Sequence, residues 1–478
     1  MIIYESAGGR LDRQEPERCS SRRFRSARHG RRATVRFGEE VVDTTVDRDF
    51  HAITMAGGIW RRNPRRGWLL VTMEHVAAQL PWPVPGLDVA ALIRDGWQPM
   101  AFTEYVVKIH SRCNLACDYC YMYEMVDQSW LKQPKVMSRA VFDDTCRLIR
   151  EHALRHSLSA VDIVFHGGEP LLVGKQNLEY FARTVRATLE PDIQVRLGLQ
   201  TNGVLIDEEF LRICDRWDVR IGVSLDGSER GHDRHRRDRR GEGSYRQVVA
   251  GLTRLRAPQW RRLFSGILCT IDLQNDPVET YEAVAGFEPP AADFMLPHGN
   301  WVMPPPGRTA DESVTPYADW LIAVFERWYG APELETTIRL FGTIIELLLG
   351  GRTSSEAVGL GPVRLVVIET DGSLEQVDEL KSAFEGATKL SIREGYGNPL
   401  ELALRDPAIA ARQIGLAALG DTCLACPVHT VCGGGHYVHR YREDTGFRNP
   451  SVYCADLKKL IQHIESRVRA EIRPVLER

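Results

Sequence analysis

Strand-like and helix-like segments alternate along residues 105–296, and this alternation constrains the fold more than any other feature of the chain. Strands joined in series by helices form right-handed units around a parallel sheet. Six such units are two short of a closed eight-fold barrel. The expected fold class is therefore α/β, with a partial (βα)6 TIM-like barrel. The predicted strands are 105–109, 161–165, 194–201, 220–224, 264–270 and 293–296, and amphipathic segments between them include 138–156, 176–189 and 245–256.

The flanking segments predict further domains, since 478 residues exceed one ordinary domain. Residues 1–36 are rich in arginine and poor in apolar side chains. This composition predicts a disordered basic head. The alternatives are a start codon assigned too early and an arm that binds nucleic acid. Residues 37–100 predict a small α+β unit with a strand at 68–71 and helices at 74–80 and 89–95. The remaining expected domains are the barrel at 101–305, a helical linker region at 306–358 and a cysteine-rich domain at 359–478.

The composition argues against several partners and locations. No apolar run approaches the roughly 18 residues of a membrane span, and the first thirty residues lack the apolar core of a secretory signal. We therefore expect a cytoplasmic protein that does not bind membranes. With 61 basic and 64 acidic side chains, the chain is nearly neutral, which argues against nucleic acid as the main partner. The eleven cysteines are expected to be thiols or metal ligands, and the scattered ones (Cys19, Cys146, Cys214 and Cys269) to be buried small apolar residues.

Three cysteines stand close together directly after the first predicted strand. Cys113, Cys117 and Cys120 have the spacing C-x3-C-x2-C, with Tyr119 before the last. Three thiolates in one short loop can hold a single cubane iron–sulfur cluster. Three protein ligands would leave one iron open to a small molecule, as catalytic metal sites keep an open position. A zinc site with His110 as fourth ligand is the alternative.

This motif resembles the signature of the radical S-adenosylmethionine (SAM) superfamily, and the resemblance covers residues 102–297. It extends to His-Gly-Gly-Glu-Pro at 166–170, Gln-Thr-Asn-Gly at 200–203 and Ser-Leu-Asp-Gly at 224–227. The resemblance implies two cofactors, a [4Fe–4S] cluster and SAM. It also implies that Glu169 accepts a hydrogen bond from the SAM amine, that Ser224 contacts the ribose and that Arg236 pairs with the SAM carboxylate. The full set of expected cofactor-binding residues is Tyr119, which stacks on adenine, and Gly167, Gly168, Glu169, Pro170, Asn202, Ser224, Asp226 and Arg236.

A second group of cysteines lies near the C-terminus, at Cys423, Cys426, Cys432 and Cys454. Four thiols suit a closed cubane or zinc site. The segment resembles the SPASM extension of radical SAM peptide maturases, whose pattern continues with C-x3-C and includes an earlier G-x4-C. Here those two cysteine positions hold His436 and Val377. We therefore expect one auxiliary [4Fe–4S] cluster rather than two.

The residue after the replaced G-x4-C cysteine is Asp378, with Glu375 and Glu379 close by. In related maturases this position is an aspartate that is proposed to accept a proton. The resemblance therefore predicts Asp378 as the catalytic base.

The chain also resembles the FxsB-type cyclophane-forming maturases at 110–124, 378–381, 432–437 and 449–454. This resemblance implies an enzyme that abstracts a β-hydrogen from a ribosomal precursor peptide and joins that carbon to an aromatic ring. It also implies an external electron donor such as flavodoxin or ferredoxin. Alternative outcomes are formylglycine formation (sulfatase maturation), thioether bonding or epimerisation. Outside enzymes, a zinc-stabilised binding protein or an electron carrier would also use cysteine clusters, but an open three-cysteine site beside Gly-Gly-Glu-Pro suits neither.

Overall fold

The computed structural model describes five strands within residues 32–71 and most of residues 82–476, without 85, 191, 354 and 393–396. The chain divides into two compact units, one spanning Ser6–Pro81 and a larger one that includes Trp82–Arg478. This division after Pro81 places residues 82–100 in the larger unit, whereas the expected domain boundary was at residue 100.

The described part of the smaller unit is an antiparallel meander in the order β1-β2-β3-β4-β5. The predicted strand at 68–71 lies within β5, but β1 begins inside the range expected to be a basic head. Residues 1–31 and the predicted helix at 74–80 lie outside the described residues. The strands are β1 (Arg32–Phe37), β2 (Glu40–Val46), β3 (Ala52–Met55), β4 (Gly58–Asn63) and β5 (Gly67–Val71).

The larger unit is built on a mostly parallel sheet, for which nine strands are described in the order β12-β11-β10-β9-β8-β7-β6-β13-β14. Its first six strands in chain order are the six predicted ones, so the α/β prediction is confirmed. β13 adds parallel to the outer edge of β6, and β14 pairs antiparallel with β13. The strands are β6 (Glu104–His110), β7 (Ala160–Gly167), β8 (Gln194–Thr201), β9 (Val219–Ser224), β10 (Phe264–Thr270), β11 (Ala291–Met295), β12 (Thr337–Ile338), β13 (Leu365–Ile368) and β14 (Leu374–Glu375).

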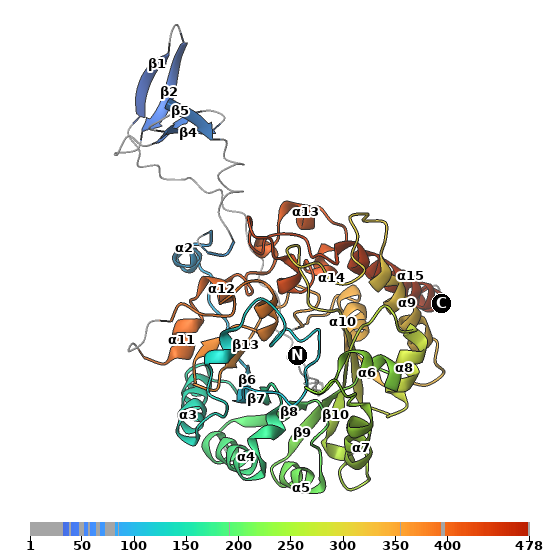
Figure 1. Ribbon diagram of the computed structural model, residues 1–478. Coiled ribbons are helices and arrows are strands. Elements are labelled where there is room, and N and C mark those ends of the chain that lie inside the picture. The colour runs from blue at the N-terminus through green and yellow to red at the C-terminus, as the bar shows by residue number, and fades with distance from the viewer. Residues whose placement is uncertain are drawn as a thin grey trace. The chain divides into compact units, whose positions relative to one another are not determined.

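Helices α3, α4, α5 and α7 follow the outer side of this sheet, and the C-terminal elements lie across from them (Figure 1). Side-chain caps help to set where the helices begin: Ser138 Oγ accepts from Val141 N at 3.2 Å and Asp207 from Phe210 N at 2.9 Å. The barrel helices are α3 (Arg139–Arg155), α4 (Lys175–Leu189), α5 (Glu208–Arg216), α6 (Glu229–His235), α7 (Tyr245–Leu255) and α8 (Pro277–Ala285). The others are α2 (Val89–Arg94), α9 (Pro316–Tyr329), α10 (Arg339–Leu348), α11 (Pro399–Ala403), α12 (Pro407–Ala410), α13 (Asp421–Leu424), α14 (His429–Cys432) and α15 (Cys454–Leu476).

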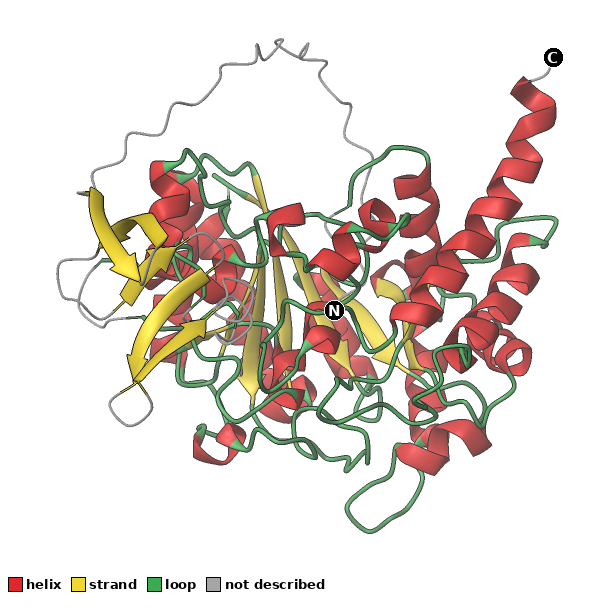
Figure 2. Ribbon diagram, turned by 90° about the horizontal axis from the view of Figure 1, so that it is seen from above, coloured by secondary structure: helices red, strands yellow, loops and turns green. Residues whose placement is uncertain are grey.

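An apolar cluster joins the barrel helices to the C-terminal segment. It runs from Phe142 on α3 and Leu178 on α4 to Phe325 on α9, Phe341 on α10 and Leu460 on α15. The long helix α15, which leads to the C-terminus in Figure 2, packs against α9 and α10. Burial of this apolar surface fixes the C-terminal segment to the barrel. Among the described residues, no helix combines the length and the apolar character needed to cross a membrane.

Candidate functional site

The loop that carries the first cysteines is packed against the end of β7. Gly168 N donates to His110 O and Glu169 N to Arg112 O, each at 3.0 Å. A Cβ on Gly167 would lie 2.0 Å from His110 O, and one on Gly168 would lie 2.6 Å from Arg112 O. Both positions therefore require glycine, because the end of β7 approaches the backbone that leads into the cysteine loop.

The thiols of Cys113, Cys117 and Cys120 line one cavity. Burial raises the pKa of Cys113 and of Cys120 to about 12, reinforced by Glu169 at Cys113 and by neighbouring thiols at both. A buried group of thiols is stable as thiolates only beside a compensating cation, and iron in a sulfide cluster is such a partner. The donor set therefore fits the predicted iron–sulfur cluster.

Six of the predicted SAM-binding residues line the same cavity, although they follow different strands. Since the carboxyl ends of parallel strands share one edge of the sheet, residues far apart in sequence meet there. The six residues are Tyr119, Gly167, Gly168, Asn202, Ser224 and Arg236. The other three, Glu169, Pro170 and Asp226, are buried and are not part of this lining.

Glu169 is bound to the protein's own backbone and side chains. Its carboxylate accepts from Thr201 Oγ1 at 2.7 Å, from Asn202 N at 2.8 Å and from Leu171 N at 3.0 Å. Burial raises the pKa of Glu169, and these hydrogen bonds oppose the rise. In this structure Glu169 therefore ties the end of β7 to the end of β8, and its contact with the SAM amine stays a prediction.

Tyr119, Asp226 and Arg236 form one polar network. Arg236 Nη1 donates to Tyr119 Oη at 2.8 Å, and Tyr119 Oη donates to Asp226, which also accepts from Thr270 N at 3.0 Å. Arg236 is 9% exposed, and its buried Nε has no hydrogen-bond partner within the described part of the chain. A guanidinium with a spare donor in this cavity fits the expected partner of a carboxylate.

The second group of cysteines comes from α13, the turn between α13 and α14, α14 itself and the start of α15. Burial raises the pKa of Cys432 to about 12 and of Cys454 to about 11, and other thiols of the group raise both values further. The charges of Cys454 and Cys423 raise the pKa of Cys432, and those of Cys423 and Cys426 raise the pKa of Cys454, so these thiols lie near one another. The structure thus brings together the four cysteines that the sequence grouped.

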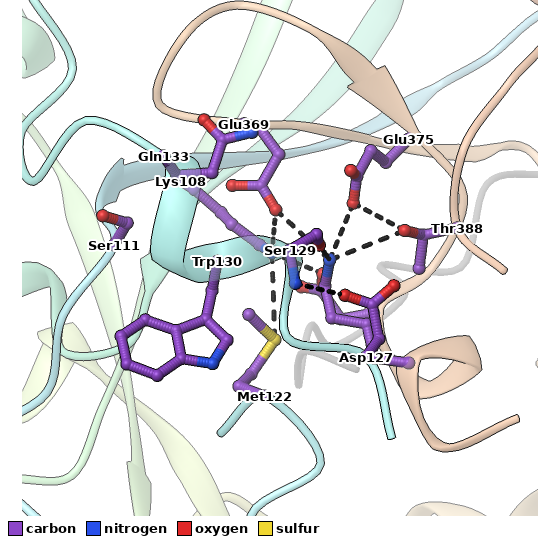
Figure 3. A network of polar contacts seen from close by, with 12 residues as sticks. Lys108, Ser111, Met122, Asp127, Ser129, Trp130, Gln133, Glu369, Glu375 and Thr388 are labelled. Carbon is purple, nitrogen blue, oxygen red and sulfur yellow. Dashed lines mark hydrogen bonds and ion pairs between the residues drawn. The ribbon is translucent and has the colours of Figure 1, made fainter. Parts of the chain in front are cut away.

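Asp378 belongs to a buried ion network. Lys108 Nζ lies 2.6 Å from Glu369 Oε1 and 2.5 Å from Asp378 Oδ1, while Lys381 Nζ lies 2.9 Å from Glu375 Oε2. Figure 3 shows Lys108 on β6 reaching Glu369, and Glu375 beside Thr388. Burial alone would lower the pKa of Lys108, but Asp378 and Glu369 outweigh it and raise the pKa. Lys108 therefore stays charged, and burial raises the pKa of Asp378 against the attraction of both lysines.

This network lies directly behind the cavity wall. Met122, which lines the cavity, has its Sδ 3.8 Å from Lys108 Nζ. Asp378 is behind the lining, whereas the adjacent Glu379 is part of it. Two neighbouring carboxylates thus have different surroundings, one paired with a lysine and the other facing the cavity.

Three histidines complete the wall and were not singled out by the sequence as site residues. His298, His436 and His439 line the cavity together with the cofactor-binding residues. His436 was noted only as a replacement for a cysteine, and His439 gave no separate signal. His298 follows the end of β11, and that position at a strand end is the signal that could have found it.

Comparisons with known proteins agree with this geometry. Residues 107–284 match the family model described as the radical SAM superfamily. The cysteine-type anaerobic sulfatase-maturating enzyme of Clostridium perfringens (strain ATCC 13124) is 24% identical over 365 residues, which cover 74% of this chain and 93% of that protein. The serine-type enzyme of Klebsiella aerogenes is 32% identical over 192 residues, 39% of this chain and 43% of the relative.

A solved structure supports the same fold. Native anSMEcpe with bound AdoMet and Cp18Cys peptide superposes with a TM-score of 0.64 at 20% identity, covering 78% of this chain and 99% of that one. At this identity the likeness concerns the fold. The arrangement of strands in this chain thus also occurs in a protein solved with bound AdoMet.

Proposed function

Since this chain is a radical SAM enzyme, we propose that it is a peptide maturase that joins an aromatic ring to a Cβ atom within a ribosomal precursor peptide. The observation that carries the proposal is the shared cavity. Its wall combines the three cysteines of the first loop, six of the predicted SAM-binding residues and Glu379. The residues for radical generation and one carboxylate thus face one space, and Asp378 lies behind its wall.

The residues of the cavity hold and orient the reactants. When bound at Cys113, Cys117 and Cys120, a [4Fe–4S] cluster supplies the electron that cleaves SAM to methionine and a 5′-deoxyadenosyl radical. Arg236 would pair with the carboxylate of SAM, and Ser224 would hold the ribose. The apolar wall at Leu268, Phe294 and Leu296 keeps water from the reacting atoms.

The crosslink requires the loss of two hydrogens from the peptide. One leaves Cβ as a hydrogen atom and forms 5′-deoxyadenosine. The carbon then bonds to the ring, and the ring recovers its aromaticity by losing one proton and one electron. The proton needs a base in the cavity wall or directly behind it, and the electron needs an acceptor within the protein.

Two features of the chain can meet these needs. The auxiliary [4Fe–4S] cluster would be the one-electron acceptor, held by Cys423, Cys426, Cys432 and Cys454. An external flavodoxin or ferredoxin-type partner would exchange electrons with the enzyme. Asp378 would accept the proton, since burial raises its pKa and so strengthens it as a base. Its neighbour Glu379 lines the cavity and is the other candidate for the proton acceptor.

Formylglycine formation is the second candidate, because the relatives described above are sulfatase-maturating enzymes of the cysteine and serine types. Both reactions take a hydrogen from a Cβ atom, so the cavity residues would serve either. They differ in the product, which is an aldehyde in one case and a ring-to-Cβ bond in the other.

The product distinguishes the two candidates. We expect that co-expression with short, aromatic-rich peptides encoded beside the gene yields a peptide lighter by two hydrogens. Tandem mass spectrometry should find no backbone fragments between the joined residues, and the product should not react with a hydrazide. A hydrazide-reactive aldehyde at a cysteine or serine would instead establish formylglycine formation.

Asp378→Asn should uncouple SAM cleavage from product formation. We expect 5′-deoxyadenosine to form at a near-normal rate while crosslinked peptide falls by about 10²–10⁴-fold, the usual contribution of a general base. Both products are measured by liquid chromatography in the same reaction. Glu379→Gln is the matched comparison: if it alone loses the crosslink, the proton acceptor is Glu379 and the assignment to Asp378 is wrong.

A further inference from the structure

A buried arginine holds the backbone directly after Cys432. Arg440, at the end of the short 3-10 helix Tyr437–Arg440, is 8% exposed. Its Nη2 donates to Gly433 O at 2.7 Å and to Gly435 O at 2.6 Å, and its Nε donates to Gly435 O at 3.2 Å. The guanidinium is therefore fixed against the loop that follows one of the four cysteines of the second group.

This loop, residues 433–435, consists of three glycines, and its backbone conformation requires them. Gly433, Gly434 and Gly435 have φ values of 61°, 83° and 71°, a region that residues with a Cβ rarely adopt. A Cβ on Gly433 would also lie 1.7 Å from Gly359 O. The loop brings main-chain donors to Cys432: Gly435 N donates to its carbonyl oxygen at 2.9 Å, and the backbone N–H of Gly434 donates to its thiol.

Arg440 differs from the nearby buried Arg412 in its charge partner. Both guanidiniums lie beside the ring of Tyr437. Arg412 Nε donates to Glu356 Oε1 at 3.0 Å, so a carboxylate balances its charge. Arg440 donates to carbonyl groups, and no carboxylate of the described residues forms an ion pair with it. A buried cation without a counter-ion is costly, so this guanidinium calls for a negative partner.

The thiols of the second group can supply the negative charge. Burial raises the pKa of Cys423 and of Cys432, and the charge of Arg440 opposes the rise at both, which places the guanidinium near both thiols. Four thiolates around an iron–sulfur core carry a net negative charge, and an electron that the core accepts adds to it. A cation buried beside the core therefore stabilises the reduced state more than the oxidised state.

We propose that Arg440 raises the reduction potential of the auxiliary cluster and so fits this cluster to take the electron that the peptide ring releases. One electron leaves the ring and reduces the cluster by one, and the flavodoxin or ferredoxin-type partner then removes it. The charge of Arg440 acts on the cluster directly, and its hydrogen bonds hold the loop from which Gly434 reaches Cys432. Net charge and hydrogen bonds to the sulfurs are two of the factors that set such potentials. This inference rests on the auxiliary cluster of the proposed function, but not on the identity of the peptide product.

The test measures the potential of the auxiliary cluster alone. In full-length protein with Cys113, Cys117 and Cys120 replaced by alanine, the second group of cysteines holds the remaining cluster. An anaerobic redox titration follows the reduced cluster by electron paramagnetic resonance. Arg440→Met in this parent protein should make the equilibrium constant for reduction about tenfold smaller, which is a shift of about 59 mV to lower potential.

Two matched variants separate the charge from the local fold. Arg440→Lys keeps the charge but loses the planar fork that reaches two carbonyls, and its potential should stay close to that of the parent protein. Lys458→Met removes an exposed cation whose charge acts on Cys454, and solvent screening should make its shift much smaller than that of Arg440→Met. An equally low potential in Arg440→Lys and Arg440→Met, or equal shifts in Lys458→Met and Arg440→Met, would overturn the proposal.

An unchanged potential in Arg440→Met with about four irons bound would overturn it as well. If Arg440→Met does not retain its iron, the wild-type protein decides: its auxiliary cluster should be reduced at a higher potential than its first cluster, and the reverse order contradicts the proposal. Zinc in place of iron in the parent protein would remove both this inference and the proposed electron acceptor. The titration needs no SAM or peptide, so the mass of the peptide product still tests the maturase proposal independently.

Discussion

Replacing Cys113, Cys117 and Cys120 together with alanine should abolish formation of 5′-deoxyadenosine and lower the cluster iron from about eight to about four atoms per chain. The three thiols line the cavity with the predicted SAM-binding residues, and burial disfavours their ionisation without a metal. Their loss should therefore remove one cluster completely and leave the site formed by the second group of cysteines. Iron, sulfide and 5′-deoxyadenosine are measured on anaerobically reconstituted protein.

Cys214→Ala is the control, since Cys214 is a buried core residue, and iron and turnover should be unchanged. About twelve irons in the wild type would contradict a single auxiliary cluster. About four in the wild type and none in the triple variant would leave the second cysteine group with zinc or empty, and would remove the proposed electron acceptor. No iron and no 5′-deoxyadenosine would contradict the assignment of both cofactors.

Lys108→Met should destabilise the larger unit by about 3–5 kcal/mol, the usual effect of removing one partner from a buried ion pair. Lys108 is 1% exposed and contacts Glu369 at 2.6 Å and Asp378 at 2.5 Å, whose side chains are 3% and 5% exposed. Without the lysine these carboxylates would stay buried with less positive charge beside them. The measurement is the free energy of unfolding in urea, monitored by circular dichroism on protein with equal cluster content.

Arg147→Met is the matched control, because Arg147 also pairs with two carboxylates, Asp144 and Glu151, but does so at the exposed surface of α3. Exposed ion pairs contribute little to stability, because solvent screens the charges. Equal losses in the two variants would show that burial of the Lys108 network has no special energetic effect.

The sequence predicted the parallel sheet well because each strand there is a local signal. The bounds of β8 and β10 are the predicted ones, 194–201 and 264–270, and the helix predicted at 245–256 is α7. Buried strands read as short apolar runs, and polar residues at their carboxyl ends mark the site. The cysteine loop and Gly167–Gly168 could therefore be placed without a structure.

Long-range pairing was harder to predict. Nothing local in the segment that forms β13 indicates that this strand pairs with β6. Lys108 and Glu369, which meet in the ion network, are 261 residues apart in the chain. The meander β1–β5 was also missed in part, because short strands with mixed polar and apolar residues give weak alternation.

The pairing of β13 with β6 has a consequence for biosynthesis. β6 is the first strand of the parallel sheet to leave the ribosome, yet its outer edge stays unpaired until the segment around Ile368 has been made. Over that interval the nascent chain exposes an apolar strand edge and a lysine whose partner carboxylate lies 261 residues downstream. Truncated or slowly translated chains should therefore be prone to aggregate, and holding chaperones should raise the yield of soluble enzyme.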